Sequence, residues 1–223
     1  MNVTQAVTTR RSIRQFTDQP IPLETLQRVL QKAQRSPSGG NTQPWNAIIL
    51  TGQPLAVLTA AIKAKAATAP LGDAPEYDIY PKGLEGRYED QRRGVGKAMF
   101  ASLNLAREDS AGRIAQMMRN WDSFGAPVQL FTYTRKYMGP PQWSDMGMWL
   151  QTVMLLLREE GLDSCAQEIW AMYGTYMRQL LDIDDDYIFF CGMAIGYRDA
   201  NAAINNFDVP RVELSEAITW RGF

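Results

Sequence analysis

Three arginines and a serine lie close together near the amino terminus, in the segment TTRRSIRQF. They are Arg10, Arg11, Ser12 and Arg14. Guanidinium groups and hydroxyls bind phosphate oxygens, and a guanidinium can do so through two parallel hydrogen bonds. If the segment is extended, residues 10, 12 and 14 point to one side while Ile13 points into the core. A solvated basic cluster is the simpler alternative. We treat these residues as a candidate phosphate site.

The chain contains no histidine, and its two cysteines, Cys165 and Cys191, are far apart in the sequence. A Ser-His-Asp or Cys-His catalytic arrangement is therefore excluded, and so is a zinc site with histidine ligands. The acidic run DIDDD at positions 182–186 is more typical of a solvated helix end than of a metal site. We expect no metal, and we expect an enzyme of this composition to take its chemistry from an organic cofactor.

A second unusual segment, SPSGGNTQPWNAIIL, combines a small, polar, glycine-rich half with an apolar half. Glycines allow a backbone to lie close to a ligand, and the following Trp45 and aliphatic residues can anchor the loop in the core. A simple turn or a flexible linker would also fit the first half. The usual nucleotide motifs do not decide the matter, because GVGKAM at 94–99 lacks both the third glycine and a preceding strand.

The elements that must position these residues alternate between helix and strand. The spacing of Leu26, Val29, Leu30 and Ala33 predicts an amphipathic helix that begins near Pro22. Further helices are expected over 54–67, 96–106 and 110–121, and strands over 45–51, 127–134 and 187–197, the last being central. Residues 71–82 and 137–143 are expected as loops or turns. The pattern indicates an α+β domain.

One expected helix, Ser144–Glu160, is apolar on nearly every side. Ser144 is the expected N-cap and Gly161 the expected end. A helix of this kind must be buried all round, and a partner subunit would bury it most easily. The final segment, 201–223, has few helix signals and is expected to be an extended arm, wrapped on a partner.

Composition limits the remaining possibilities. The chain has 223 residues and a formal net charge of −1, so no overall field recruits nucleic acid or a membrane. No apolar run is long enough to span a bilayer, and the first residues do not resemble a signal peptide. We therefore expect a cytoplasmic protein with reduced cysteines.

Four motifs together resemble the FMN-dependent nitroreductase family. In order they are RRSIRQF, SPSGGNTQPW, GLDSCAQEIW and VPRVEL, and the long helix is similar to that family's dimer-forming helix. The region 71–121 resembles that of the nitrobenzoate-reductase-like branch. The resemblance covers nearly the whole chain, 1–223, as one domain with an excursion at 71–121 and an arm at 201–223. It implies a central mixed or antiparallel sheet flanked by helices, in a domain-exchanged homodimer.

The resemblance also implies which residues bind FMN. The phosphate and the ribityl or pyrimidine end would be held by the basic cluster and by a residue near the carboxyl terminus. The full set is Arg10, Arg11, Ser12, Arg14 and Arg211, with Pro37, Ser38, Gly39 and Asn41 of the other subunit along the ring, and Gln167, Glu168 and Ile169 near its N5 atom. A backbone N–H of Glu168 or Ile169 would face N5. Asn120 is a further candidate at the pyrimidine edge.

Two sites depart from the family pattern. Val209 stands where many members have a second basic residue, which places more of the phosphate charge on Arg10 and Arg211. Ala166 stands where proline is common before the N5 turn.

By resemblance the protein is an NAD(P)H-dependent oxidoreductase that reduces nitroaromatic compounds, and also quinones, by ping-pong hydride transfer through the flavin. No catalytic side chain is then required. Alternatives on the same fold are a reductive dehalogenase, an enone reductase, a flavin-destroying enzyme, or a flavoprotein without catalysis.

Overall fold

The structure, a computed structural model, describes all residues 1–223 and is built around one antiparallel sheet. Its four strands run in the order β1-β2-β4-β3. Their bounds are β1 Asn46–Thr51, β2 Val128–Arg135, β3 Asp163–Gln167 and β4 Tyr187–Gly196. The expected α+β class and antiparallel sheet are confirmed, and β4 is internal to the sheet as its glycine-containing apolar sequence predicted.

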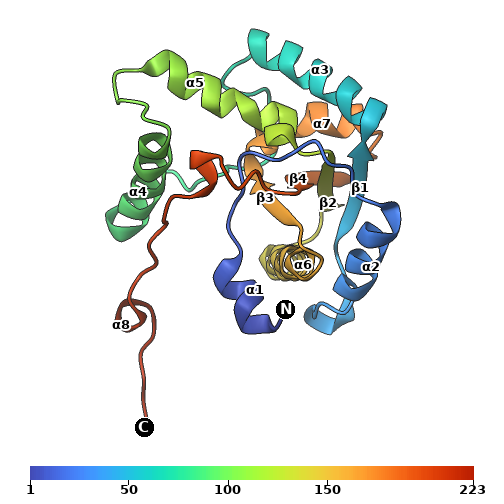
Figure 1. Cartoon of the computed structure of the whole chain (residues 1–223). Coiled ribbons are helices and arrows are strands. Elements are labelled where there is room, and N and C mark those ends of the chain that lie inside the picture. Colours follow the sequence, from blue (N-terminus) through green and yellow to red (C-terminus); the bar gives the residue numbers. More distant parts are fainter.

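Helices cover both faces of this sheet (Figure 1). The α-helices are α1 Val3–Thr9, α2 Leu23–Ala33, α3 Gly52–Thr68, α4 Gly86–Ser102, α5 Ser110–Met118, α6 Pro140–Glu159, α7 Gly174–Leu180 and α8 Leu214–Ala217. The 3-10 segments are η1 Gly39–Asn41, η2 Arg119–Gly125, η3 Glu168–Tyr173 and η4 Ala203–Asn205. On one face α2 and α6 pack against Leu130 and Met193; on the other, α3, η3 and α7 pack against Phe131 and Phe189.

An extra residue in β4 explains why two side chains that lie two positions apart pack in the cores on opposite faces of the sheet. Thr132 pairs with Cys191 but Tyr133 pairs with Phe189, so Phe190 has no partner in the register. Strand side chains alternate between faces, and this bulge sends Phe189 and Cys191 to opposite sides. Close packing also explains Gly192, because a Cβ there would lie 2.5 Å from Gln129 Nε2 and 2.7 Å from Trp170 Cδ1.

The long apolar helix α6 begins earlier than expected. The predicted turn over 137–143 ends at Gly139, and the prediction of Ser144 as N-cap was wrong, because Pro140 and Pro141 occupy the first helical positions, where a missing N–H costs nothing. Gly139 is the N-cap, and the Gln142 side chain accepts a hydrogen bond from its N–H at 3.2 Å. Trp149 and Val153 lie in the chain's own core, whereas Met148 is 39% exposed and Leu155 is half-buried.

Several elements escaped the sequence patterns. The short elements α1, β3 and α7 were not predicted. The helix expected over 96–106 is α4, which begins ten residues earlier at Gly86 and ends at Ser102, and α5 ends at Met118 rather than at Trp121. The rejected motif GVGKAM lies inside α4. The arm 201–223 is extended as expected, apart from two short helical turns, η4 and α8.

The excursion between α3 and α5 is anchored at its beginning. Gly72 lies so close to Met172 that a Cβ would come within 2.7 Å of the Met172 carbonyl oxygen, and φ there is +96°. Glu76 forms a 3.1 Å ion pair with the buried Arg178, and the Tyr77 hydroxyl donates to the Phe190 carbonyl. These contacts hold residues 72–77 against the body of the protein, and further along the excursion α4 lies beside η4.

The C-terminal arm leaves the body of the molecule and ends in free space (Figure 1). Its large apolar side chains are exposed: Leu214, Ile218, Trp220 and Phe223. None of the helices combines the length and the apolar character that crossing a bilayer requires.

Candidate functional site

The basic segment near the amino terminus lies along the outer edge of β3. Ser12 forms a parallel bridge with Ser164, and the Ile13 N–H donates to the Ser164 carbonyl at 3.0 Å. Ile13 is fully buried beside Phe16 and Cys165. Ile13 points into the core as expected, but the expected grouping of Arg10, Ser12 and Arg14 is not met, because Arg11 lines one cavity with Arg10 and Ser12 whereas Arg14 lines the next.

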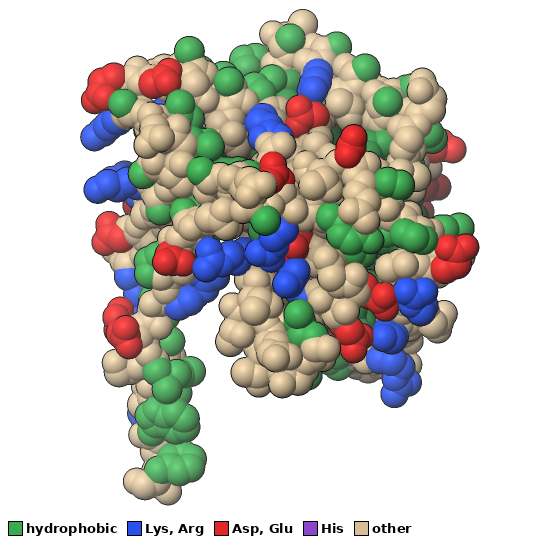
Figure 2. Space-filling model, viewed as in Figure 1, with side chains coloured by type: hydrophobic (Ala, Val, Ile, Leu, Met, Phe, Trp, Pro, Cys, Tyr) green, Lys and Arg blue, Asp and Glu red, His purple; other side chains and the backbone are tan.

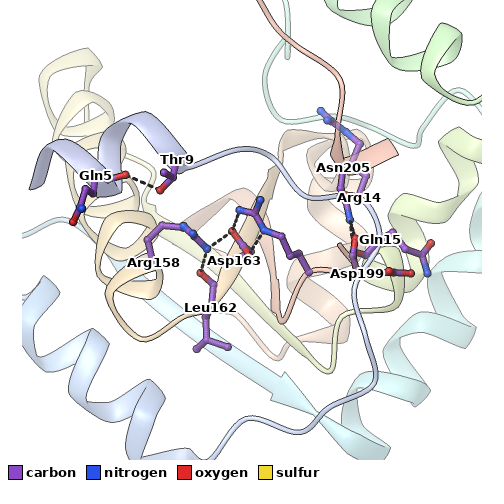
Figure 3. Close-up of polar contacts among 10 residues, drawn as sticks. Gln5, Thr9, Arg14, Gln15, Arg158, Leu162, Asp163, Asp199 and Asn205 are labelled. Atoms are coloured by element: carbon purple, nitrogen blue, oxygen red, sulfur yellow. Dashed lines mark hydrogen bonds and ion pairs between the residues drawn. The ribbon is translucent and has the colours of Figure 1, made fainter. Parts of the chain in front are cut away.

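The start of the C-terminal arm is fastened to the same segment by Asn205 (Figure 3). The buried Asn205 side chain accepts from the Arg14 N–H at 2.8 Å and donates to the Gln15 carbonyl at 2.8 Å. It also donates to the Asp199 carbonyl at 2.9 Å. These bonds use both ends of the amide, so the arm leaves the body at a defined point beside Arg10.

The first cavity, of about 490 Å³, lies between the amino-terminal segment and the arm. Arg10, Ser12 and Arg211 line it, and Figure 2 shows Lys and Arg side chains gathered where the arm leaves the body. Burial lowers the pKa of Arg10, and the nearby charge of Arg211 lowers it further. The buried Arg10 Nε has no hydrogen-bond partner. Two guanidiniums facing each other, one with an unpaired donor, fit a bound anion.

Arg11 has a different role from its neighbours. Its guanidinium is paired with Asp208 at 3.0 Å and donates to the Phe207 carbonyl at 3.1 Å. This places Arg11 on the wall of the cavity, where it holds the arm. Arg211 donates to the carbonyls of Val209 and Pro210 through one nitrogen.

A buried cluster of ion pairs connects the start of β3 to α6 and to the segment that follows β4 (Figure 3). Asp163, at the first position of β3, is 2% exposed and accepts from Arg198 at 2.6 Å through both carboxylate oxygens. Arg158 of α6 donates to the same carboxylate at 2.8 Å. Asp163 therefore joins α6, β3 and the segment after β4 next to the residues that line both cavities.

The second cavity, of about 560 Å³, lies over the end of β3. Ten of the seventeen residues that line it are hydrophobic. One wall is formed by Arg14 and by the β3–η3 junction, Ala166–Ile169, and the opposite wall comes from the excursion. Gln167 donates through Nε2 to the carbonyl and side-chain oxygens of Asn120 at 3.0 and 3.1 Å. The apolar surroundings raise the pKa of the Glu168 carboxyl through desolvation.

The glycine-rich loop lies outside both cavities of its own chain. Residues 37–41 line neither of them and are mostly exposed. The Gly39 N–H donates to the buried Asp145 at 3.1 Å, and Gly40 has φ of +57°, a value that glycine adopts without strain. Trp45 anchors the loop, since its indole stacks on Trp149 with ring centroids 6.1 Å apart.

The two cavities together match the two ends of FMN. Residues 10–12 line an anion site, and Arg14 of the same segment lines a mostly apolar cavity, as a flavin with a phosphate at one end would require. Of the residues suggested by the sequence, the first cavity contains Arg10, Arg11, Ser12 and Arg211, and the second contains Arg14, Gln167, Glu168, Ile169 and the further candidate Asn120. Pro37, Ser38, Gly39 and Asn41 are not brought to either one.

The sequence indicated that the excursion 71–121 contributes to the substrate pocket, but it did not show which of its residues do so. Those residues include Ile79, Tyr80, Arg92, Val95, Met99, Phe100, Gln116 and Met117. Sequence reasoning also missed Asn205 and Asp208. No motif marks these residues, and only the fold brings them to the cavities. Across the chain, no cluster of three or more His, Cys, Asp or Glu residues could hold a metal ion.

Comparison with known proteins gives matches along nearly the whole chain. Residues 7–197 match the model of the Nitroreductase family. The chloronitrobenzene nitroreductase of Comamonas testosteroni is 35% identical over 95% of this chain and 93% of that protein. The 4-nitrobenzoate reductase of Pseudomonas putida is 33% identical over 96% and 92%. The solved structure of the FMN- and NADPH-dependent nitroreductase NfnB from Sphingopyxis sp. strain HMH is 52% identical, with a TM-score of 0.98 and 100% coverage of both chains.

Proposed function

The chain belongs to the nitroreductase family, and we propose that it is an FMN-dependent enzyme that oxidises NADPH and reduces nitroaromatic compounds. The match to the FMN- and NADPH-dependent NfnB over the full length of both chains supports the cofactor and the reductant. Full-length relatives named for chloronitrobenzene and 4-nitrobenzoate support the class of acceptor.

The observation that carries the proposal is the pair of adjoining cavities. Arg10 and Arg211 line one of them, where the one lining carboxylate, Asp208, is paired with Arg11, and the other is mostly apolar. A ligand with an anionic end and a flat aromatic end matches both. Within the site, Arg10, Ser12 and Arg211 would bind the phosphate, while Arg14, Gln167 and the backbone at Glu168–Ile169 would contact the ring.

FMN, when bound, supplies hydride transfer from NADPH to the acceptor. The protein then needs to bind, orient and exclude water, and no side chain in the apolar cavity has to act as an acid or base. The hydrogen bonds between Gln167 and Asn120 tie the junction after β3 to η2. The apolar residues of the excursion would keep water from the reacting atoms.

A homodimer with exchanged arms accounts for the features that one chain leaves incomplete. The arm presents Ile218, Trp220 and Phe223 to solvent, and α6 presents Met148. The loop 37–41 lies away from the cavities of its own chain and would reach those of a partner. Burial of these apolar side chains would stabilise the association by about 25 cal/mol per Å² of apolar surface removed from water.

The purified protein tests the proposal directly. We expect a yellow protein, or an apoprotein that FMN restores, whose flavin absorbance is bleached by NADPH without oxygen and restored by a nitroarene. A quinone and an enone in the same assay distinguish the acceptors. Flavin binding without bleaching would instead identify a non-catalytic flavoprotein, and failure to bind FMN would refute the proposal.

A further inference from the structure

The charged residues of the apolar cavity are few. Among the residues that line it, only Arg14 and Arg92 are basic and only Glu168 is acidic. Arg14 belongs to the amino-terminal segment on the flavin side of the proposed site. Arg92, on α4, is therefore the one guanidinium that the excursion wall offers to a substrate.

Arg92 is already paired. Glu89, one helical turn earlier, accepts from Arg92 Nε at 2.7 Å and from Nη2 at 2.8 Å, a two-point contact that uses both carboxylate oxygens. The Arg92 guanidinium also lies over the Tyr80 ring, 5.3 Å from its centroid. Arg93 adds a second ion pair to the same carboxylate. Hydrogen bonds from Arg92 and then Arg93 lower the pKa of Glu89 to about 2, so Glu89 stays ionised throughout the useful pH range.

Glu168, unlike Glu89, has an unpaired carboxylate. No hydrogen bond or ion pair engages its carboxylate, although it lines the cavity beside Ile169. A substrate carboxylate in this cavity would thus meet a paired guanidinium and an unpaired like charge. Like charges repel each other, and a like charge placed against an unwanted ligand is a common means of rejecting it.

We propose that this cavity selects uncharged aromatic acceptors over aromatic carboxylates, because Glu89 withholds Arg92 from the substrate while Glu168 faces it. The inference rests on the proposed function and makes it more specific. It assigns Glu89 and Arg92 as residues that determine specificity by their pairing with each other.

Two acceptors that differ mainly in charge, 4-nitrobenzoate and methyl 4-nitrobenzoate, test the inference. The FMN-loaded protein is reduced beforehand without oxygen and mixed with each acceptor, so that NADPH binding does not enter. Each variant's rate constant is divided by the wild-type value for the same acceptor, which cancels the intrinsic reactivity of the two compounds. Calorimetric binding of benzoate and methyl benzoate, which are not reduced, gives a second readout.

Four variants separate the contributions. Arg92→Gln should change the rates for the two acceptors by the same factor, because Glu89 already engages this guanidinium in the wild-type protein. Glu89→Gln frees Arg92 and should raise the 4-nitrobenzoate rate about three- to tenfold, tighten benzoate to a similar extent, and leave the esters unchanged. The double variant Glu89→Gln/Arg92→Gln should lose that gain. Arg93→Gln, the matched control, keeps the Glu89–Arg92 pair and should resemble wild type.

Two results would overturn the inference while leaving the proposed function intact. One is a selective loss of 4-nitrobenzoate reduction, about tenfold or more, in Arg92→Gln, which would mean that Arg92 reads a substrate carboxylate. The other is an unchanged preference in Glu89→Gln. If neither acceptor reoxidises the flavin of the wild-type protein, the proposed function itself fails.

Discussion

Removing Arg10 or Arg211 should weaken FMN binding far more than it weakens folding. Burial and the neighbouring Arg211 both lower the pKa of Arg10, which means that the folded chain without a ligand disfavours the Arg10 charge. The Arg10 Nε is buried and unpaired, and the Arg211 side chain donates only to carbonyls of its own segment. Neither guanidinium has a carboxylate partner to lose.

The size of the effect follows from the contacts that each variant removes. A hydrogen bond to a charged group contributes about 1.5–3 kcal/mol, and about 1.4 kcal/mol corresponds to a tenfold change in affinity. We therefore expect Arg10→Ala and Arg211→Ala each to raise the Kd for FMN roughly ten- to a hundredfold. The apoprotein of Arg211→Ala should melt at the wild-type temperature or above it, because a repulsion is relieved.

Titration of the apoproteins with FMN, followed by flavin fluorescence, measures the Kd, and thermal melting of the same samples measures stability. Arg28→Ala is the matched control, since Arg28 is an exposed arginine that pairs with Glu160 on another face of the molecule. Retention of FMN within about twofold of wild type in both Arg10→Ala and Arg211→Ala would refute the assignment of the phosphate site.

Three further predictions concern association, pH and the buried ion cluster. Met148→Asp should yield a folded monomer in sedimentation, with weakened flavin binding. Charged residues at Trp149 or Val153 would instead disrupt the chain's own core and would not test the interface. A yellow Met148→Asp dimer would count against an interface at α6. Glu168→Gln should keep most of the rate of flavin reduction by NADPH, with a nearly flat pH profile. Burial raises the pKa of Glu168, so its charge is unfavourable in the folded state. The Gln variant should therefore melt at a higher temperature than wild type at neutral pH and lose that advantage in acid. A large loss in the rate of flavin reduction would show instead that Glu168 is a proton donor. Asp163→Asn should lower the free energy of unfolding by about 3–5 kcal/mol in urea titrations, since it leaves Arg158 and Arg198 without their shared partner; an unchanged midpoint would contradict this.

Local patterns in the sequence were sufficient for several elements and for part of the site. The spacing of Leu26, Val29 and Ala33 predicted α2, and these three residues are buried as the spacing requires. The apolar runs at 45–51, 127–134 and 187–197 predicted β1, β2 and β4. The alternation along 10–14 correctly predicted that Ile13 is buried, because side chains of an extended chain alternate between two sides, but it did not predict that Arg14 lines a different cavity from Arg10 and Ser12.

Local patterns failed where a contact from elsewhere in the chain determined the structure. β3 reads DSCAQ, which has no strand signature, and it becomes a strand by pairing with β4. The two prolines at 140–141 look like a turn in the sequence, yet they begin the central helix because the first turn does not need their N–H groups.

The absence of histidine and the clustered arginines are properties of the sequence alone, and they indicated an organic cofactor and a candidate phosphate site, whereas FMN was implied by the resemblance of four motifs to a known family. Only the tertiary structure showed that Asn205 fastens the start of the arm to Arg14 and Gln15, and only the tertiary structure brought Arg92 and Glu168 to one cavity. The physical reason is that hydropathy and spacing act over a few residues, whereas a binding site depends on which distant segments pack together.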